Sequence, residues 1–218
     1  YLMMLLLRLL GEKSYIAMEN PAYRSSYDTI TSLGRKVAPI AVDENGLSVD
    51  QLIESEANIA YVTPSHQFPL GMVMPASRRT QLLNWANFEP SRYIIEDDYD
   101  SEFRYHGRPI PALQSMDHGK KVIYFGSFSK VISPAIRMSY MVLPDPLLYN
   151  YRQMFKSFPC TVSRLDQSIM TKFLAQGYFE RHLNRLRKRY KTRHDILMKE
   201  LKRFGDRVRL SGSNAGSY

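Results

Sequence analysis

Short apolar runs alternate with helical patterns along this chain of 218 residues. The apolar runs are rich in β-branched and aromatic side chains, which is typical of buried strands, and they predict strands at residues 15–18, 37–42, 59–63, 93–96, 122–125 and 140–143. Apolar side chains three and four positions apart predict helices at residues 2–10, 22–33, 49–54, 77–86, 146–155, 164–175 and 178–204. This alternation favours an α/β fold in which helices cover both faces of a mostly parallel sheet.

The apolar start of the chain, Tyr1 to Leu10, has some features of a targeting segment. It is short, has no basic region before it, and leads into Gly11-Glu12-Lys13 without a cleavage site of small residues. We therefore predict a buried helix here and not a signal peptide. No stretch of the sequence is long enough to span a bilayer. Because the chain begins with Tyr and not Met, we expect it to be a fragment of a longer protein.

The composition is that of an ordinary globular protein, with 44% hydrophobic and 23% charged residues. Cys160 is the single cysteine, which excludes an internal disulfide framework and suits a reducing compartment, so we expect a cytoplasmic protein. The five histidines are scattered, and none has another ligand at zinc-site spacing. A disulfide scaffold and a structural zinc site are therefore not expected.

The net charge of +9 is concentrated near the end of the chain, where 13 Lys and Arg face four acids between residues 172 and 209. A basic surface of this kind can attract nucleic acid. The apolar side chains of the same stretch recur at helical spacing, however, at Leu183, Leu186, Tyr190, Leu197, Leu201 and Phe204. We therefore favour the solvated face of a long amphipathic helix over a nucleic-acid site.

Two polar motifs follow predicted strands. Lys130 closes the run Gly126-Ser127-Phe128-Ser129-Lys130, directly after the strand at 122–125, and Asp97 follows the strand at 93–96. An isolated lysine is nearly always a surface charge, but a lysine at a strand end can present a neutral amine to an aldehyde cofactor. A carboxylate beside it can pair with a protonated pyridine nitrogen. Ligands of parallel sheets bind at the carboxyl ends of the strands, so both motifs are expected in one cleft.

The acid is not unique in sequence, because Asp98 and Asp100 are rivals of Asp97. Alternation along an extended segment puts Asp97 and Tyr99 on one face and the other two acids on the opposite face. Tyr99 is then placed to donate a hydrogen bond to the phenolic oxygen of the cofactor. A buried core tyrosine is an equally good interpretation of Tyr99 taken alone.

Further side chains complete a predicted pyridoxal phosphate site. The guanidinium of Arg137, seven residues after Lys130, suits bidentate phosphate binding, and the hydroxyl groups of Ser127 and Ser129 can donate to the same phosphate. Tyr23 follows the first predicted strand and can stack on a flat ring. Each of these residues also has an ordinary explanation, as a loop serine or a side chain packed on the core.

The loop at residues 63–71 also follows a strand, and its Pro and Gly residues indicate a fixed turn. His66 and Gln67 in this loop are within reach of the edge of a cofactor. We do not favour His66 as a general base.

Taken together, these motifs resemble the aminotransferase-like domain of MocR/GabR-type bacterial transcription regulators of the GntR family. The stretches that carry the resemblance are Thr63-Pro64-Ser65-His66-Gln67-Phe68-Pro69, the acidic and aromatic run from Ile94 to Tyr105, Pro111-Ala112-Leu113-Gln114-Ser115 and Phe128-Ser129-Lys130. The resemblance implies the large domain of a fold type I aminotransferase, with a mostly parallel seven-stranded sheet between helices. Residues 1–176 would form this large domain, and residues 177–218 the long basic interdomain helix and the start of the small C-terminal domain.

The resemblance also implies roles for individual residues. Lys130 is the expected Schiff-base lysine, Asp97 the partner of the pyridine nitrogen, Tyr99 the partner of the phenolic oxygen and Tyr23 the stacking aromatic. Arg137, Ser127 and Ser129 are expected to hold the phosphate. An amino acid or amine (γ-aminobutyrate in GabR-type members) is the expected effector, and a homodimer is the expected assembly. DNA would be bound only through a winged-helix domain outside this chain.

Some expected parts are missing or altered. A glycine that commonly precedes the phosphate arginine is replaced in Pro134-Ala135-Ile136-Arg137, which would strain a turn that needs positive φ. The glycine-rich phosphate turn and the arginine that binds the substrate carboxylate are expected outside residues 1–218. Two alternatives to a sensor therefore stay open, namely a catalytic class I/II aminotransferase and a partner-binding domain that has lost its cofactor.

Overall fold

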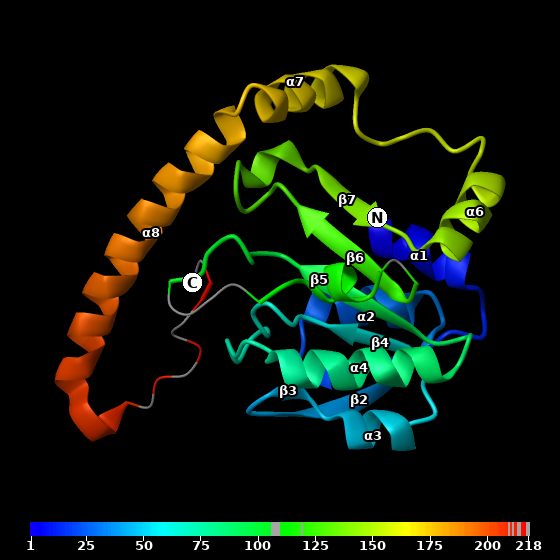
Figure 1. Ribbon diagram of the computed structural model, residues 1–218, viewed down its shortest axis with the longest axis horizontal. Helices are drawn as coiled ribbons and strands as arrows, with labels where there is room; N and C mark the ends of the chain where they lie inside the picture. Colours follow the sequence, from blue (N-terminus) through cyan, green and yellow to red (C-terminus); the bar gives the residue numbers. More distant parts are fainter. Residues whose placement is uncertain (106–109, 119, 209, 211, 213–214, 217–218) are drawn as a thin grey trace.

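The strands form one seven-stranded sheet in the order β3-β2-β1-β4-β5-β6-β7 (Figure 1). In the computed structural model, which describes residues 1–105, 110–118, 120–208, 210, 212 and 215–216, the inner strands all run parallel. The edge strands β3 and β7 are antiparallel to their neighbours. The strands are β1 (Tyr15–Asn20), β2 (Lys36–Asp43), β3 (Gly46–Leu47), β4 (Ile59–Val62), β5 (Tyr93–Asp98), β6 (Val122–Ser127) and β7 (Ser139–Val142).

Helices cover both faces of this sheet, each over its own apolar cluster. One face packs against α3 (Val49–Glu54), α4 (Ala76–Phe88) and α5 (Leu113–Met116). The other packs against α1 (Leu2–Leu10), α2 (Arg24–Ser32) and α6 (Asp145–Met154). Successive side chains of a strand alternate between the two clusters, as Ile94 and Ile95 of β5 do. The central strands β1, β4, β5 and β6 are rich in buried apolar residues because both of their faces are covered.

The order in which the chain adds strands to the sheet reverses between β1 and β4. From β1 the chain goes outward to β2 and β3, and then returns to the other side of β1 to add β4, β5, β6 and β7. The segments that follow β1 and β4 lead to helices on opposite faces, α2 and α4 respectively. Such a switch point leaves a crevice outside the carboxyl ends of the two strands, and this crevice is the expected place for a ligand.

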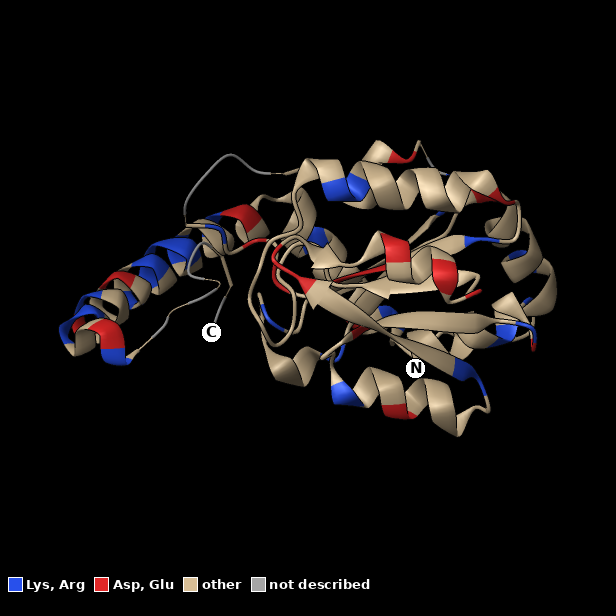
Figure 2. Cartoon of the chain, turned by 90° about the horizontal axis from the view of Figure 1, so that it is seen from below, with Lys and Arg blue, Asp and Glu red and all other residues tan. Residues whose placement is uncertain are grey.

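Two helices, α7 (Arg164–Ala175) and α8 (Tyr178–Leu201), extend away from the sheet (Figure 1). Figure 2 shows that Lys and Arg residues are spread along α8. Only the first half of the predicted apolar stripe packs on the body, where Leu183, Leu186 and Tyr190 contact Phe103 and Val131. The second half of the stripe differs, because its side chains Leu197 and Phe204 are exposed. A hydrophobic face needs an opposing surface, and these two side chains find none among the described residues.

Most predicted elements are present, and their ends differ by only a few residues. The α-helix α8 stops at Leu201 because a 3-10 segment, Lys202–Arg207, follows it and contains the non-helical Gly205. Three short elements were not predicted, namely β3, α5 and the 3-10 turn η1 (Pro134–Ile136). From residue 208 onward, the expected start of the small C-terminal domain lies largely outside the described residues. Among the described residues, no helix has both the length and the apolar character needed to cross a membrane.

Candidate functional site

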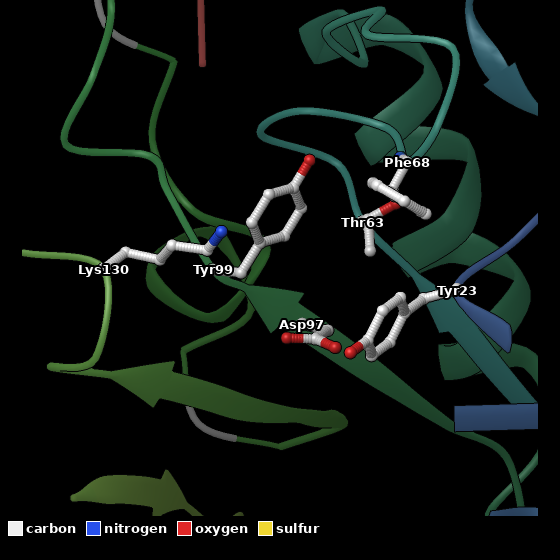
Figure 3. A pocket seen from close by; sticks show the side chains of 6 residues that line it. All are labelled: Tyr23, Thr63, Phe68, Asp97, Tyr99 and Lys130. Atoms are coloured by element: carbon white, nitrogen blue, oxygen red, sulfur yellow. The ribbon is translucent and has the colours of Figure 1, made fainter. Parts of the chain in front are cut away.

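A cavity of about 230 Å³ opens at the carboxyl ends of the central strands. Figure 3 shows the six side chains that line it, which are Tyr23, Thr63, Phe68, Asp97, Tyr99 and Lys130. They come from the segments that follow β1, β4 and β6 and from the end of β5. The structure therefore brings the predicted lysine, its predicted acid partner and the predicted aromatic side chain to one cavity.

A second hollow of about 360 Å³ adjoins the cavity, because Tyr23 and Asp97 line both. Ser127 and Arg137, which were predicted to hold a phosphate, line this second hollow. Ser129, the third residue predicted to hold the phosphate, is not among the described residues that line either hollow. Its backbone N–H donates to the Ser127 hydroxyl at 3.2 Å, so Ser129 supports the orientation of Ser127.

Asp97 lies near the end of β5 and keeps part of its surface open to the cavity. The Tyr61 hydroxyl donates a hydrogen bond to its carboxylate, and Ser26 in turn lies 2.9 Å from the Tyr61 hydroxyl. Burial raises the pKa of Asp97 to about 6; the Tyr61 hydrogen bond opposes this shift and the neighbouring charge of Asp98 adds to it. A carboxylate desolvated in this way is strongly stabilised by a cation placed beside it.

The hydroxyl of Tyr99 is turned toward His66 and not toward Asp97 (Figure 3). It donates to the backbone carbonyl of His66 at 2.8 Å and lies 3.0 Å from His66 Nδ1. The same Nδ1 is 3.1 Å from a carboxylate oxygen of Asp100. Burial and the charge of Asp100 raise the pKa of the Tyr99 hydroxyl, which therefore stays protonated at neutral pH.

The carboxylate of Asp98, the remaining alternative to Asp97, is hydrogen-bonded on the other side of β5. It accepts hydrogen bonds from the Tyr124 hydroxyl at 2.6 Å and from the backbone N–H of Ser101 at 3.2 Å. Of the three aspartates, only Asp97 is among the residues that line the cavity. The alternation argument thus selects the carboxylate that the fold places at the site.

Lys130 and Arg137 belong to the segment that joins β6 to β7. Hydrogen bonds between Phe128 and Met138 and between Ile132 and Phe128 fold this segment back on itself. Arg137 ends the turn η1 with a positive φ of 47°, and its side chain is exposed at the rim of the second hollow. Ala135 lies inside η1 and is not among the residues with positive φ. The strain considered for a missing glycine therefore does not arise at position 135.

Several residues of the site had no predicted role. Thr63 and Phe68 belong to a loop whose turn residues were recognised, but nothing in the sequence showed which of its side chains would face the cavity. Tyr61 reads as an ordinary strand residue, and its bond to Asp97 depends on the pairing of β4 with β5. Glu19, near the end of β1, is only 3% exposed. The feature of the sequence that could have indicated its role is a carboxylate near the end of an apolar strand.

A sequence profile of the family Aminotransferase class I and II matches residues 2–218 of the chain. The chain belongs to this family. It is a part-length member, since it spans less than half of the curated relatives that it matches. Many members of the family use pyridoxal phosphate, and the cavity described above lies where ligands of this sheet architecture bind.

Regulatory proteins are prominent among the relatives of this aminotransferase-family chain. It is 42% identical over 202 residues to the uncharacterized HTH-type transcriptional regulator YdeL of Bacillus subtilis, which covers 92% of the chain and 43% of YdeL. It is 33% identical over 214 residues to the probable rhizopine catabolism regulatory protein MocR of Rhizobium meliloti, covering 97% of the chain and 43% of MocR. The predicted resemblance to MocR-type regulators is confirmed.

Solved aminotransferases share the fold. The multiple substrate aminotransferase of Thermococcus profundus superposes with a TM-score of 0.86 at 28% identity, over 99% of this chain and 56% of that enzyme. The kynurenine aminotransferase of Pyrococcus horikoshii gives 0.86 at 27% identity, with the same coverage. The predicted fold class, a mostly parallel seven-stranded sheet between helices, is confirmed.

Proposed function

We propose that this chain is the pyridoxal-phosphate-binding, amino-acid-sensing domain of a MocR-type transcription regulator. One observation carries the proposal: the amine of Lys130 and the carboxylate of Asp97 line the same cavity, with Tyr23 on its wall. The similarity to the HTH-type regulator YdeL and to the regulatory protein MocR supports a regulator. DNA would then be bound by a separate winged-helix domain, in the cytoplasm, and the effector would be an amino acid or amine.

The donor set of the two hollows fits pyridoxal phosphate. Asp97 is a partly desolvated acid with a raised pKa, and a cationic ring nitrogen would relieve the cost of its charge. Tyr23 offers an aromatic face that is half exposed and therefore open to a planar ring. Ser127 and Arg137 bring a hydroxyl and a guanidinium to the adjoining hollow, which suits a phosphate.

Each of these side chains would act on the cofactor in a definite way. When bound, pyridoxal phosphate supplies an electrophilic aldehyde carbon and a ring that accepts electrons. Lys130 would bind it covalently through Nζ, and Asp97 would hold the proton on the ring nitrogen. Tyr99 would need its hydroxyl to be shared between His66 and the cofactor, since it now donates to the His66 carbonyl.

Covalent capture by Lys130 tests the proposal. We expect the full-length protein to retain pyridoxal phosphate through denaturation after borohydride reduction, with the added mass on the peptide that contains residue 130. Lys130→Ala should lose this adduct completely, because no other described residue that lines the cavity carries an amine. Lys156→Ala, at an exposed lysine of the same chain, is the matched control and should keep it. An undiminished adduct in Lys130→Ala contradicts the assignment.

A catalytic aminotransferase is the second candidate function. It is supported by 28% identity over 198 residues to the aromatic-amino-acid aminotransferase 1 of Thermococcus litoralis. The two candidates differ in turnover, so the cofactor-loaded full-length protein is mixed with a panel of amino acids. A change in absorbance without release of a keto acid identifies a sensor, and release identifies an enzyme. Complete failure to bind the cofactor identifies a partner-binding domain.

A further inference from the structure

Glu19 occupies the switch point of the sheet, where the cofactor crevice begins. The backbone pairing of β1 with β4 extends only to Met18 and Tyr61. Beyond that pair, hydrogen bonds to the Glu19 carboxylate connect the end of β1 to the segment that follows β4. Its Oε2 accepts the Thr63 backbone N–H at 3.2 Å and the Thr63 hydroxyl at 2.6 Å.

A second connection runs through Gln67. Its side-chain amide donates to Glu19 Oε2 at 3.3 Å and to the carbonyl oxygen of Pro21 at 2.9 Å. Gln67 Oε1 accepts the N–H of Leu70 at 3.0 Å, which closes the loop after β4. Glu19 and Gln67 thus join the segment that follows β1 to the loop that follows β4.

Side chains of these two segments line the cavity together. Tyr23 follows β1, and Thr63 and Phe68 follow β4. The rings of Tyr23 and Phe68 meet edge to face, with centroids 5.5 Å apart and planes at 89°. The relative position of the two segments decides how much room a planar ring has beside Tyr23, and the contacts of Glu19 and Gln67 join the two segments.

We infer that Glu19 is a positioning residue of the cofactor site, which holds the Tyr23 segment and the loop from Thr63 to Phe68 at the spacing that a pyridoxal ring requires. This inference rests on the proposed function of the cavity. It adds a residue that does not line the cavity and acts only through its neighbours.

Burial of Glu19 is costly, which argues for a role beyond filling space. The side chain is 3% exposed, and Oε1 is buried without a hydrogen-bond partner among the described residues. Burial raises the pKa of Glu19 to about 7; the donors Thr63 and Gln67 oppose the shift, and the charge of Asp97 adds to it. An apolar side chain would avoid this cost but would leave the Thr63 N–H and hydroxyl and the Gln67 amide without this acceptor, so the contacts account for a polar side chain here.

Hydrogen exchange and cofactor affinity test the inference together in the full-length protein. In the cofactor-free state, we expect Glu19→Ala to speed amide exchange of residues 63–71 by about tenfold or more, because the Thr63 N–H loses its acceptor. Exchange in α4 should stay unchanged and serves as the internal reference. We also expect the Kd for pyridoxal phosphate to rise by about tenfold, the effect of one or two lost hydrogen bonds.

Conservative and matched variants separate positioning from general instability. Glu19→Gln keeps an acceptor oxygen in place and should restore the Kd to within about threefold of the wild type. Glu54→Gln, at an exposed residue, is the control and should change neither readout. Where Glu19→Ala does not fold, Gln67→Ala removes the second connection, to Glu19 and Pro21, leaves the Glu19–Thr63 bonds in place and should also raise the Kd. Adding Glu19→Gln to Gln67→Ala should then have little further effect.

The outcomes distinguish this inference from the proposed function. A wild-type protein that forms no adduct overturns the proposed function, and exchange at residues 63–71 still reports whether Glu19 holds the loop. A wild type that binds the cofactor, with Glu19→Ala or Gln67→Ala binding it equally well, overturns the inference alone. Unchanged exchange at residues 63–71 in Glu19→Ala also overturns it.

Discussion

At the scale of single residues, the site consists of acids and hydroxyls whose protonation is set by burial. The charge of Asp97 adds to the raised pKa of Glu19, and the charges of both acids add to the raised pKa values of Tyr61 and Tyr99. The two carboxyl groups have different partners, because one borders the cavity and the other ties two segments together. Their substitutions should therefore have different consequences.

Asp97→Asn should weaken pyridoxal phosphate binding by about tenfold to a hundredfold, because it removes the charge beside the ring nitrogen. The covalent adduct at Lys130 should still form. Affinity is measured by titrating the cofactor-free full-length protein and following absorbance. Asp98→Asn is the neighbouring control; its carboxylate is already held by Tyr124 and Ser101, so its effect on affinity should be small. Equal affinity in Asp97→Asn and the wild type would remove Asp97 from the site.

The raised pKa of Glu19 predicts how stability depends on pH. Its value is about 7 in the folded protein against 4.5 for the model side chain, so the folded state binds more protons between these values. The contribution of Glu19 to stability therefore falls as pH rises from about 4.5 to 7. Without cofactor, the stability of Glu19→Gln relative to the wild type should rise over this window by up to about 3 kcal/mol. Urea unfolding at several pH values measures the difference, and a pH-independent difference would contradict the shifted pKa.

At the scale of elements, the loop after β4 is held from behind by α4. Arg79 of α4 is 1% exposed and donates to the carbonyl oxygens of Met74, Pro111 and Pro64. Glu96 of β5 lies 3.7 Å from it and accepts the first N–H groups of α5. One buried ion pair thus anchors three segments around the cavity.

Arg79→Met should lower the free energy of unfolding by about 3 to 5 kcal/mol, because it leaves three carbonyl oxygens and the Glu96 charge without their partner. Urea or thermal unfolding measures the loss. Arg24→Met makes the same change at an exposed pair with Asp28 on α2 and should cost no more than about 0.5 kcal/mol. A similar small cost at both positions would show that the buried pair does not anchor the loop.

At the scale of the whole molecule, several apolar side chains of α6 and α7 face solvent. Tyr149 of α6 and Leu165 and Ile169 of α7 are 66%, 70% and 57% exposed. Aminotransferases of this fold are typically dimeric, and subunit interfaces bury apolar side chains that are exposed in the separate chains.

We expect the full-length protein to form a homodimer in solution. Light scattering coupled to size-exclusion chromatography should give twice the mass of one chain over a wide concentration range. The cofactor-loaded and cofactor-free forms should be compared, because a ligand that binds only the folded dimer also stabilises it. A monomer at every concentration, with cofactor bound, would contradict the proposed assembly.

The sequence by itself determined the local chemistry and the order of the elements. Short apolar runs alternating with helical patterns were sufficient for the α/β class, and alternation along 97–100 separated Asp97 and Tyr99 from Asp98 and Asp100 without showing which pair faces a ligand. Lys130, Tyr23, Ser127 and Arg137 were recognisable because they follow apolar strands or stand in a motif. These features depend on residues close in sequence, and local sterics and burial patterns decide them.

Only the tertiary structure decided which distant residues meet. The contacts of Tyr61 with Asp97, of Glu19 with Thr63 and of Tyr99 with His66 each join segments more than 30 residues apart. The exposure of Leu197 and Phe204 could not be predicted either, because the spacing of apolar residues along a helix does not show whether another surface packs against them. Strand order and register set these contacts, and both depend on the packing of the whole sheet rather than on any single stretch of sequence.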